Sequence, residues 1–171
     1  LFVKLLDDDA GGACSVAFDG PTGSARRYLP DTNILETTFT TETGRARLVD
    51  LRPVNPPSPE PDEGPDGESE SRLIRLLTCE RGRVAGTFRV RPTFDYARRP
   101  CTPLVEGRSV LFEAGDWRVR VNAQACPTLA GDAAEIRFDL AEGETAYLVL
   151  TDGEDQDDAC IDDFAGARRR L

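Results

Sequence analysis

Short runs in which apolar and polar residues alternate constrain this chain more than any other feature of its sequence. In "RVAGTFRVR" the residues Val84, Phe88 and Val90 alternate with arginine, alanine and threonine, which is the period of a half-buried β-strand. The segments "WRVRVNA" and "EIRFDL" repeat the pattern, whereas "RLIRLLTC" and "AYLVLT" are apolar on both faces. We expect the last two to be central or covered strands.

Glycine-containing turns separate these runs. The four turns share a glutamate followed by a glycine, at Glu42-Thr43-Gly44, Glu80-Arg81-Gly82, Glu113-Ala114-Gly115 and Glu142-Gly143. Glycine adopts the positive φ that tight hairpins need, so each turn predicts a hairpin. Because almost no helical pattern precedes Asp157, the fold class predicted for residues 1–156 is all-β, an antiparallel β-sandwich.

Arginines occupy the polar positions of two predicted strands. These arginines are Arg83, Arg89, Arg91, Arg118 and Arg120. We expect their side chains on the face of each strand opposite the apolar residues. Two interpretations are open. The arginines could pair with acids on neighbouring strands, or, if the strands share a sheet, Arg89 and Arg118 could belong to an interface with another domain.

The composition restricts the chemistry of the chain. It has 171 residues, 39% of them hydrophobic, which suits one folded domain. Histidine is absent, which removes the usual general base and leaves carboxylate, tyrosine or cysteine chemistry. Two carboxylates can hydrolyse a glycoside without histidine. No acid here sits in a recognisable strand-end cluster with an apolar pocket, so no catalytic residue is predicted.

Cysteines and acids indicate no metal or cofactor. The cysteines, which are odd in number and form no C-x-x-C pair, are Cys14, Cys79, Cys101, Cys126 and Cys160. Reduced structural thiols in the cytosol are the expected state, so the predicted location is cytoplasmic. The acidic run "DGEDQDD" does not follow the ligand order of an EF-hand, and solvated acids explain it better.

The charge distribution restricts the partners. The formal net charge is −10, and arginines are interspersed with acids, so nucleic acid is not an expected partner. No apolar run approaches the roughly 20 residues that cross a bilayer, so a membrane is not expected either. Residues 55–71 are rich in Pro, Glu, Asp, Gly and Ser, and they predict a long, acidic, low-complexity loop.

The carboxy-terminal segment, residues 157–171, carries the one helical pattern. Ile161, Phe164 and Leu171 lie on one helical face, with acids at the start and arginines at the end, as the helix dipole favours. We expect this helix to be a linker that continues into a following domain. The absence of methionine and the start at Leu1 likewise suit a piece of a longer chain.

Two turns combine arginine, tyrosine and aspartate more densely than folding alone demands. The candidate residues are Arg27, Tyr28, Asp31 and Asn33 in "RRYLPDTN" and Asp95, Tyr96 and Arg98 in "RPTFDYARR". They are either an interface or only well-formed corners. Among the aromatic side chains, Tyr28 and Tyr96 are the best placed for binding, whereas Trp117 is in phase with the apolar residues of its strand and is expected in the core.

Three segments in this order resemble one known family. "LLDDDAGGACSVAF", "RRYLPDTNILETTFTTETGRARLVDLRPV" and "RPTFDYARRP" are similar to the amino-terminal domain of bacterial glycoside hydrolase family 15 proteins, the glucoamylase, glucodextranase and trehalase-like group. The resemblance covers most of residues 1–100, and the middle segment is its most specific part. It implies a β-sandwich of the supersandwich type, joined by a helical linker to an (α/α)6 barrel that carries the catalytic glutamates.

The resemblance implies a role without catalysis, because that barrel is not in this sequence. The chain would be an accessory domain that packs against the barrel of its parent chain and stabilises it, and contact with trehalose or an α-glucan would come only through the parent. The alternative is a free-standing β-sandwich module that binds carbohydrate or protein. Helical, aromatic-rich sequence after this region in the uncut reading frame would favour the accessory domain.

Overall fold

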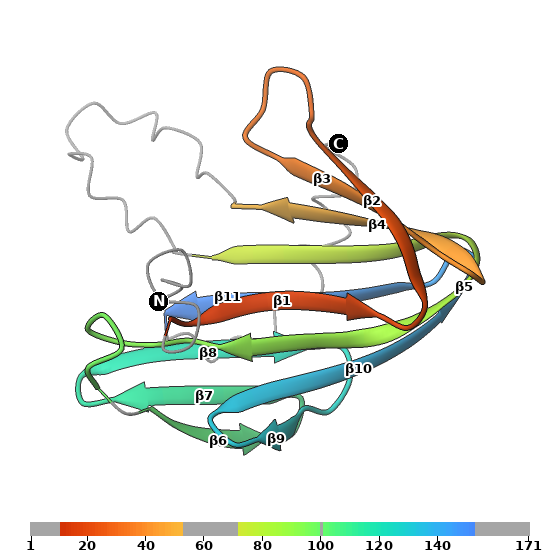
Figure 1. Ribbon diagram of the computed structural model, residues 1–171. Helices are drawn as coiled ribbons and strands as arrows, with labels where there is room; N and C mark the ends of the chain where they lie inside the picture. Colours follow the sequence, from red (N-terminus) through yellow and green to blue (C-terminus); the bar gives the residue numbers. More distant parts are fainter. Residues whose placement is uncertain (1–10, 53–71, 100, 153–171) are drawn as a thin grey trace, which may run out of the picture.

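A computed structural model describes residues 11–52, 72–99 and 101–152 of the chain, and these residues form an all-β, antiparallel sandwich (Figure 1). The predicted fold class is therefore confirmed. The described ranges hold no helix, and so none that is long and apolar enough to cross a membrane. The acidic loop predicted at 55–71 and the linker helix predicted at 157–171 lie outside the described residues.

The part of the chain that the structure describes forms eleven strands. They are β1 (Ala13–Phe18), β2 (Pro21–Tyr28), β3 (Leu35–Thr41), β4 (Gly44–Leu51), β5 (Leu73–Arg91), β6 (Thr102–Glu106), β7 (Ser109–Ala114), β8 (Trp117–Ala123), β9 (Thr128–Ala130), β10 (Ala133–Ala141) and β11 (Thr145–Asp152).

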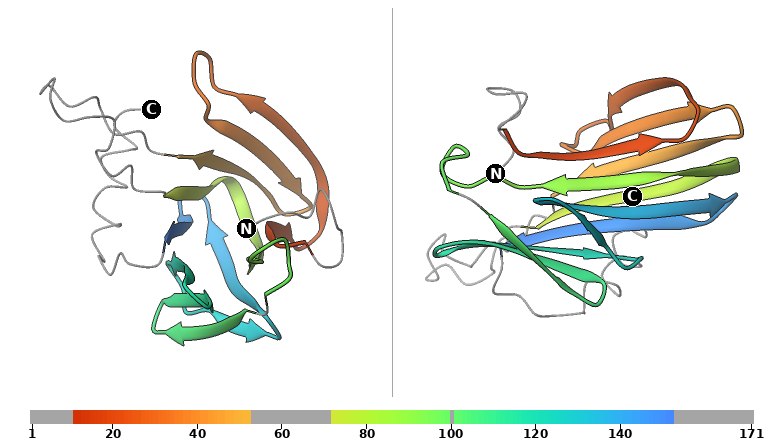
Figure 2. Two further views of the ribbon diagram at one scale, coloured as in Figure 1. Left: turned by 90° about the vertical axis from the view of Figure 1, so that its left-hand side faces the viewer. Right: turned by 60° about the horizontal axis from the view of Figure 1, so that its bottom comes forward.

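The strands form two layers of unequal width (Figure 2). The wide layer has the order β2-β3-β4-β5-β11-β8-β7-β6. The narrow layer consists of β1, the second half of β5, β10 and the short β9. The long strand β5 belongs to both layers, because it pairs with β4 and β11 before Gly82 and with β1 and β10 after it.

A sharp bend at Gly82 lets β5 pass between the layers. Gly82 has φ of +72°, and a Cβ there would lie 2.3 Å from the carbonyl oxygen of Thr43. The connection between β10 and β11 crosses beside it, where the Gly143 amide donates to the Cys79 carbonyl at 2.9 Å. The predicted hairpin at Glu80 to Gly82 is therefore wrong, because the chain changes layers there.

The other predicted turns differ in their use of glycine. Gly115 and Gly143 have φ of +67° and +85°, as hairpin turns require. Gly44 begins β4 without a positive φ. It is needed for close packing, since a Cβ there would lie 2.6 Å from the Arg81 carbonyl oxygen.

The core between the layers is built on phenylalanines. Phe18 lies with its ring centroid 4.6 Å from Phe39 and 5.4 Å from Phe138, and Phe138 is 5.2 Å from Phe88. These residues come from both layers, so the cluster joins them. Gly86 makes room for the cluster, because a Cβ there would lie 2.7 Å from Cζ of Phe138, and also 2.2 Å from the Ala17 carbonyl oxygen.

The two runs that are apolar on both faces form the centre of the wide layer. They are the first half of β5 and the neighbouring β11. Their outer face holds a second small cluster in which Ile74 and Val149 are buried and Tyr147 is half-buried. The prediction that these strands are central is confirmed.

Candidate functional site

The loop between β2 and β3 holds its own shape. Pro30 and Asp31 form a turn in which Asp31 has φ of +57°, and the Thr32 amide donates to the Leu29 carbonyl at 3.2 Å. The Thr32 hydroxyl also donates to this carbonyl, at 3.0 Å, and accepts from the Ile34 amide at 3.2 Å. Proline followed by a residue with positive φ is typical of a type II turn. Local chemistry therefore explains the shape of "LPDTN".

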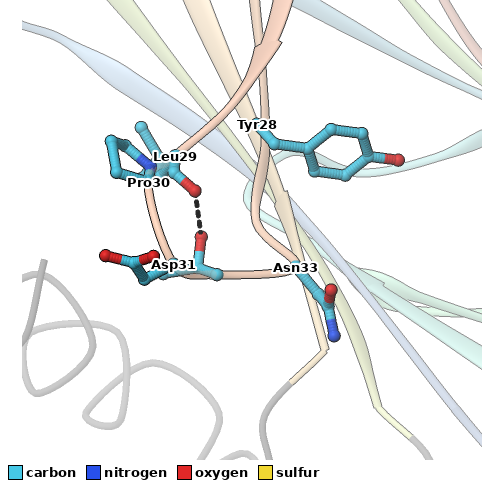
Figure 3. A pocket seen from close by; sticks show the side chains of 6 residues that line it. Tyr28, Leu29, Pro30, Asp31 and Asn33 are labelled. Atoms are coloured by element: carbon cyan, nitrogen blue, oxygen red, sulfur yellow. Dashed lines mark hydrogen bonds between the residues drawn. The ribbon is translucent and has the colours of Figure 1, made fainter.

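The side chains of this loop diverge. The loop borders a shallow, open hollow lined by Tyr28, Leu29, Pro30, Asp31, Thr32 and Asn33. Figure 3 shows the Tyr28 ring pointing to one side, the Asp31 carboxylate to the other and the Asn33 amide in a third direction. A small-molecule site needs polar groups that converge on one point, and these do not.

Arg27 belongs to an ionic cluster on the outer face of the wide layer. Its guanidinium contacts the Glu36 carboxylate at 2.7 Å, and Arg47 contacts the same carboxylate at 3.4 Å. The Glu36 side chain is only 6% exposed. Burial opposes ionisation of Glu36, but the hydrogen bonds from Arg27 and Arg47 outweigh it and lower the pKa of Glu36. Arg27 is therefore engaged within the fold.

The second candidate turn, between β5 and β6, is strained. Asp95, Tyr96 and Ala97 have φ of +48°, +55° and +65°. Three consecutive residues other than glycine in the left-handed region are rare, and each costs roughly 1–2 kcal/mol. The buried Phe94, which bridges to Arg99, holds the base of the turn. Arg98 also closes it, since its amide donates to the Asp95 carbonyl at 3.1 Å.

The outward arginines are paired with acids. Arg89 contacts Glu135 on β10, and Arg118 contacts Glu113 on β7 at 3.0 Å. The remaining pairs are Arg83 with Asp139, Arg91 with Asp132 and Arg120 with Glu106. The arginines on β5 belong to the narrow layer and those on β8 to the wide layer, so they form no common basic patch. Pairing between strands accounts for the pattern.

Trp117 is 60% exposed, so the prediction that it lies in the core is wrong. It is in phase with Val119 and Val121, which are buried. However, it is the first residue of β8 and pairs with the last residue of β7. Phase gives the direction of a side chain, but at the end of a strand no residue of the opposite layer covers it.

The structure separates the two candidate turns. The register places both at the same ends of the strands, but β2 and β6 are opposite edges of the wide layer. In Figure 1 the β2–β3 loop rises at the top, whereas the turn after β5 lies at the left. Tyr28 and Tyr96 are both exposed, at 66% and 72%.

Sequence reasoning missed a buried ionic group between the layers. Arg75 on β5 contacts Asp50 at 2.7 Å, and it donates to the Cys14 carbonyl at 2.8 Å and to the Cys14 sulfur at 3.3 Å. Asp50 and Arg75 lie on adjacent strands of the wide layer and Cys14 on β1 of the narrow one. One signal could have revealed this group: Arg75 is a charged residue within the apolar run "RLIRLLTC", at a position that faces the opposite layer.

The described thiols with shifted pKa values and the acid beside the second cavity are shifted away from the values that a nucleophile or a general acid needs. Burial raises the pKa of the thiols of Cys14, Cys79 and Cys101, which opposes a nucleophilic role. A cavity of about 280 Å³ beside β10 has Arg137 and Asp139 as its charged residues. The hydrogen bond from Arg83 lowers the pKa of Asp139, whereas a general acid needs a raised pKa. Within the described ranges, no group of three or more metal-ligating side chains gathers.

Comparison with known proteins relates the chain to trehalases. It is 29% identical over 168 residues to a trehalase of Mycolicibacterium smegmatis, which covers 88% of this chain and 25% of the relative. It is 28% identical over 168 residues to a trehalase of Mycobacterium tuberculosis, which covers 88% of this chain and 24% of that relative. Trehalase 1 of Sulfolobus acidocaldarius is 30% identical over 96 residues, 56% of this chain and 14% of the relative.

These similarities extend over most of the chain but over a small part of the relatives. Neither a family model nor a solved structure matches the sequence. The chain spans about a quarter of the length of the two mycobacterial trehalases. The chain is therefore similar, over most of its length, to a part of trehalases.

Proposed function

We propose that this chain is the non-catalytic, amino-terminal accessory domain of a glycoside hydrolase of the family 15 type, and that it packs against the catalytic (α/α)6 domain of the same longer protein and stabilises it. The observation that carries this proposal is the similarity to about a quarter of two trehalases. The parent would hydrolyse trehalose or an α-glucan. The four described cysteines are free thiols, which supports a cytoplasmic location.

Two features of the described residues support a role without catalysis. Many acids on the strands are held by arginine, as Glu135 is by Arg89 and Asp139 by Arg83. Glycoside hydrolysis needs one carboxyl group with a raised pKa and a second carboxyl group across a cleft. The described acids with shifted pKa values, Glu36 and Asp139, are both shifted downward.

A free-standing binding module is the second candidate. The exposed aromatic side chains of Tyr28, Tyr96 and Trp117 favour it, since exposed aromatic rings can stack on a sugar or bury against a protein. For the accessory domain, the nine residues of the two turns and the arginine faces stay candidates for the interface with the catalytic barrel. They are Arg27, Tyr28, Asp31, Asn33, Asp95, Tyr96, Arg98, Arg89 and Arg118.

The test compares the pure 171-residue chain with the complete gene product. We expect the chain alone to release no glucose from trehalose, maltose or dextrin, whereas the complete gene product releases glucose from at least one of them. Glucose release is measured with a coupled oxidase assay. Turnover by the chain alone that is abolished by changing one of its own carboxylates would overturn the proposal.

A further inference from the structure

One end of the sandwich combines backbone strain with two exposed aromatic side chains. The turn that carries Tyr96 keeps three consecutive residues in the left-handed region. Trp117, the one tryptophan of the chain, begins β8 at the same end. Strain of this kind persists where the surrounding structure over-determines it, and it concentrates at functional sites.

The two aromatic residues belong to neighbouring turns. A Cβ added to Gly115 would lie 2.9 Å from Nη1 of Arg99, so the Arg99 side chain, at the end of the Tyr96 turn, reaches the turn that precedes Trp117. In Figure 1 both turns lie at the left end of the molecule. We call this surface the aromatic end and define it by Tyr96, Arg99 and Trp117.

The composition of the aromatic end suits contact with a protein. Tyrosine, tryptophan and arginine are the residues that contribute most at protein interfaces. Two charge pairs lie next to the rings, Arg99 with Asp95 at 3.9 Å and Arg118 with Glu113 at 3.0 Å. The exposed rings, 72% for Tyr96 and 60% for Trp117, are the large hydrophobic side chains that a partner could bury here.

The path of the chain indicates the occupant. β11 ends at Asp152, which pairs with Val119, two residues from Trp117. The chain therefore leaves the described sandwich at the aromatic end, where β11 points to the left in Figure 1. In relatives of which this chain spans about a quarter, most of the protein lies outside the matched part.

We infer that the aromatic end is the surface that docks on the catalytic domain of the longer protein. The inference rests on the proposed function and deepens it, because it selects one surface among the candidates. The β2–β3 loop carries an equally exposed tyrosine, Tyr28, but it lies at the opposite edge of the wide layer and is stabilised by its own hydrogen bonds. The proposed docking surface also does not require Arg89 and Arg118, which are paired with Glu135 and Glu113 within the chain.

The experiment uses Trp117→Ser and Tyr96→Ser, with Tyr28→Ser as the matched control because its ring is equally exposed. Each variant is made in the complete gene product and in the 171-residue chain, and Tm is measured in both. We expect Trp117→Ser and Tyr96→Ser to lower the Tm of the complete protein by about 4–8 °C and to leave that of the chain nearly unchanged. Tyr28→Ser is expected to change neither.

Other outcomes overturn the inference in distinguishable ways. If removal of the chain destabilises the catalytic domain while Trp117→Ser and Tyr96→Ser do not, the proposed function stands and the docking surface is wrong. Equal losses for Tyr28→Ser also contradict the choice of surface. If trehalose or maltohexaose quenches or shifts Trp117 fluorescence in the chain alone, the surface binds sugar. A complete gene product without a catalytic domain would contradict the proposed function itself.

Discussion

At the scale of single residues, two buried ionic groups distinguish this sandwich from one held by apolar packing alone. Glu36 lies under Arg27 and Arg47 on the outer face of the wide layer. Arg75 lies between the layers with Asp50 and Cys14. Buried charges are tolerated when partners and hydrogen bonds replace water, and both groups have such partners.

Glu36 makes stability depend on pH. Its pKa is lower in the folded protein than in the unfolded chain, so its contribution is present at neutral pH and is lost as the pH falls, from about pH 5 downward. We expect Glu36→Gln to lower the free energy of unfolding at pH 7 and to reduce its slope below pH 5. Urea midpoints between pH 7 and pH 3 measure both effects.

In Glu36→Gln the dependence of the unfolding free energy on pH should become weaker but should not disappear, because Arg83 also lowers the pKa of Asp139. Glu113→Gln is the control, since both members of its pair with Arg118 are largely exposed, and such pairs contribute about 0–1 kcal/mol. An unchanged slope in Glu36→Gln would contradict the assignment.

Arg75 and Asp50 should behave as a coupled pair. Their side chains are 11% and 20% exposed, so Arg75→Met or Asp50→Asn leaves the other charge buried without its partner. We expect each single variant to lose about 2–4 kcal/mol of unfolding free energy. The double variant should lose less than the sum of the two, as measured in a double-mutant cycle by urea denaturation. Additive losses would mean that the two residues do not interact.

At the scale of elements, the corners of the sandwich depend on glycine in different ways. Gly82, within β5, combines a positive φ with a carbonyl oxygen 2.3 Å from the site of a Cβ. Gly143, before β11, has a positive φ with open space around it. Gly23, on β2, has open space and no positive φ. The three glycines separate the effects of strain and close packing.

Alanine substitutions at these positions should therefore form a graded series. Gly143→Ala is expected to lose about 1 kcal/mol from strain alone. Gly82→Ala should lose at least about 2 kcal/mol more, because the β3–β4 turn at Thr43 and strand β5 must move apart to admit the methyl group. Gly23→Ala should be close to neutral. Thermal unfolding ranks the three variants, and a loss in Gly143→Ala equal to that in Gly82→Ala would contradict the close-packing argument.

At the scale of the whole molecule, the two layers differ in width, and the difference exposes β2. All eight residues of β2 are exposed, and within the described ranges it pairs with β3 alone. By contrast, β11 pairs on both sides and holds the buried residues Leu148, Val149 and Leu150. We therefore expect β2 to open locally at a lower free energy than β11.

Amide exchange should measure that contrast. We expect amides of β2 to exchange at least about a hundredfold faster than those of β11, because opening β2 exposes little apolar surface. Hydrogen–deuterium exchange of the 171-residue chain, followed by mass spectrometry, provides the rates. Equal protection of the two strands would show that β2 is covered in solution.

Local patterns in the sequence were enough to predict much of the local structure, because alternation of apolar and polar residues, turn glycines and proline act over a few neighbouring residues. Those patterns predicted the all-β class, the central position of the apolar strands and the outward arginines. Which strands share a layer could not be predicted in this way, since pairing joins residues far apart in the chain. For that reason Glu80 to Gly82 proved to be a crossing between layers and Trp117 proved to be exposed beyond the core. The same long-range pairing brought Arg75, Asp50 and Cys14 together and set the Tyr96 turn beside Trp117, and no local pattern contains that information.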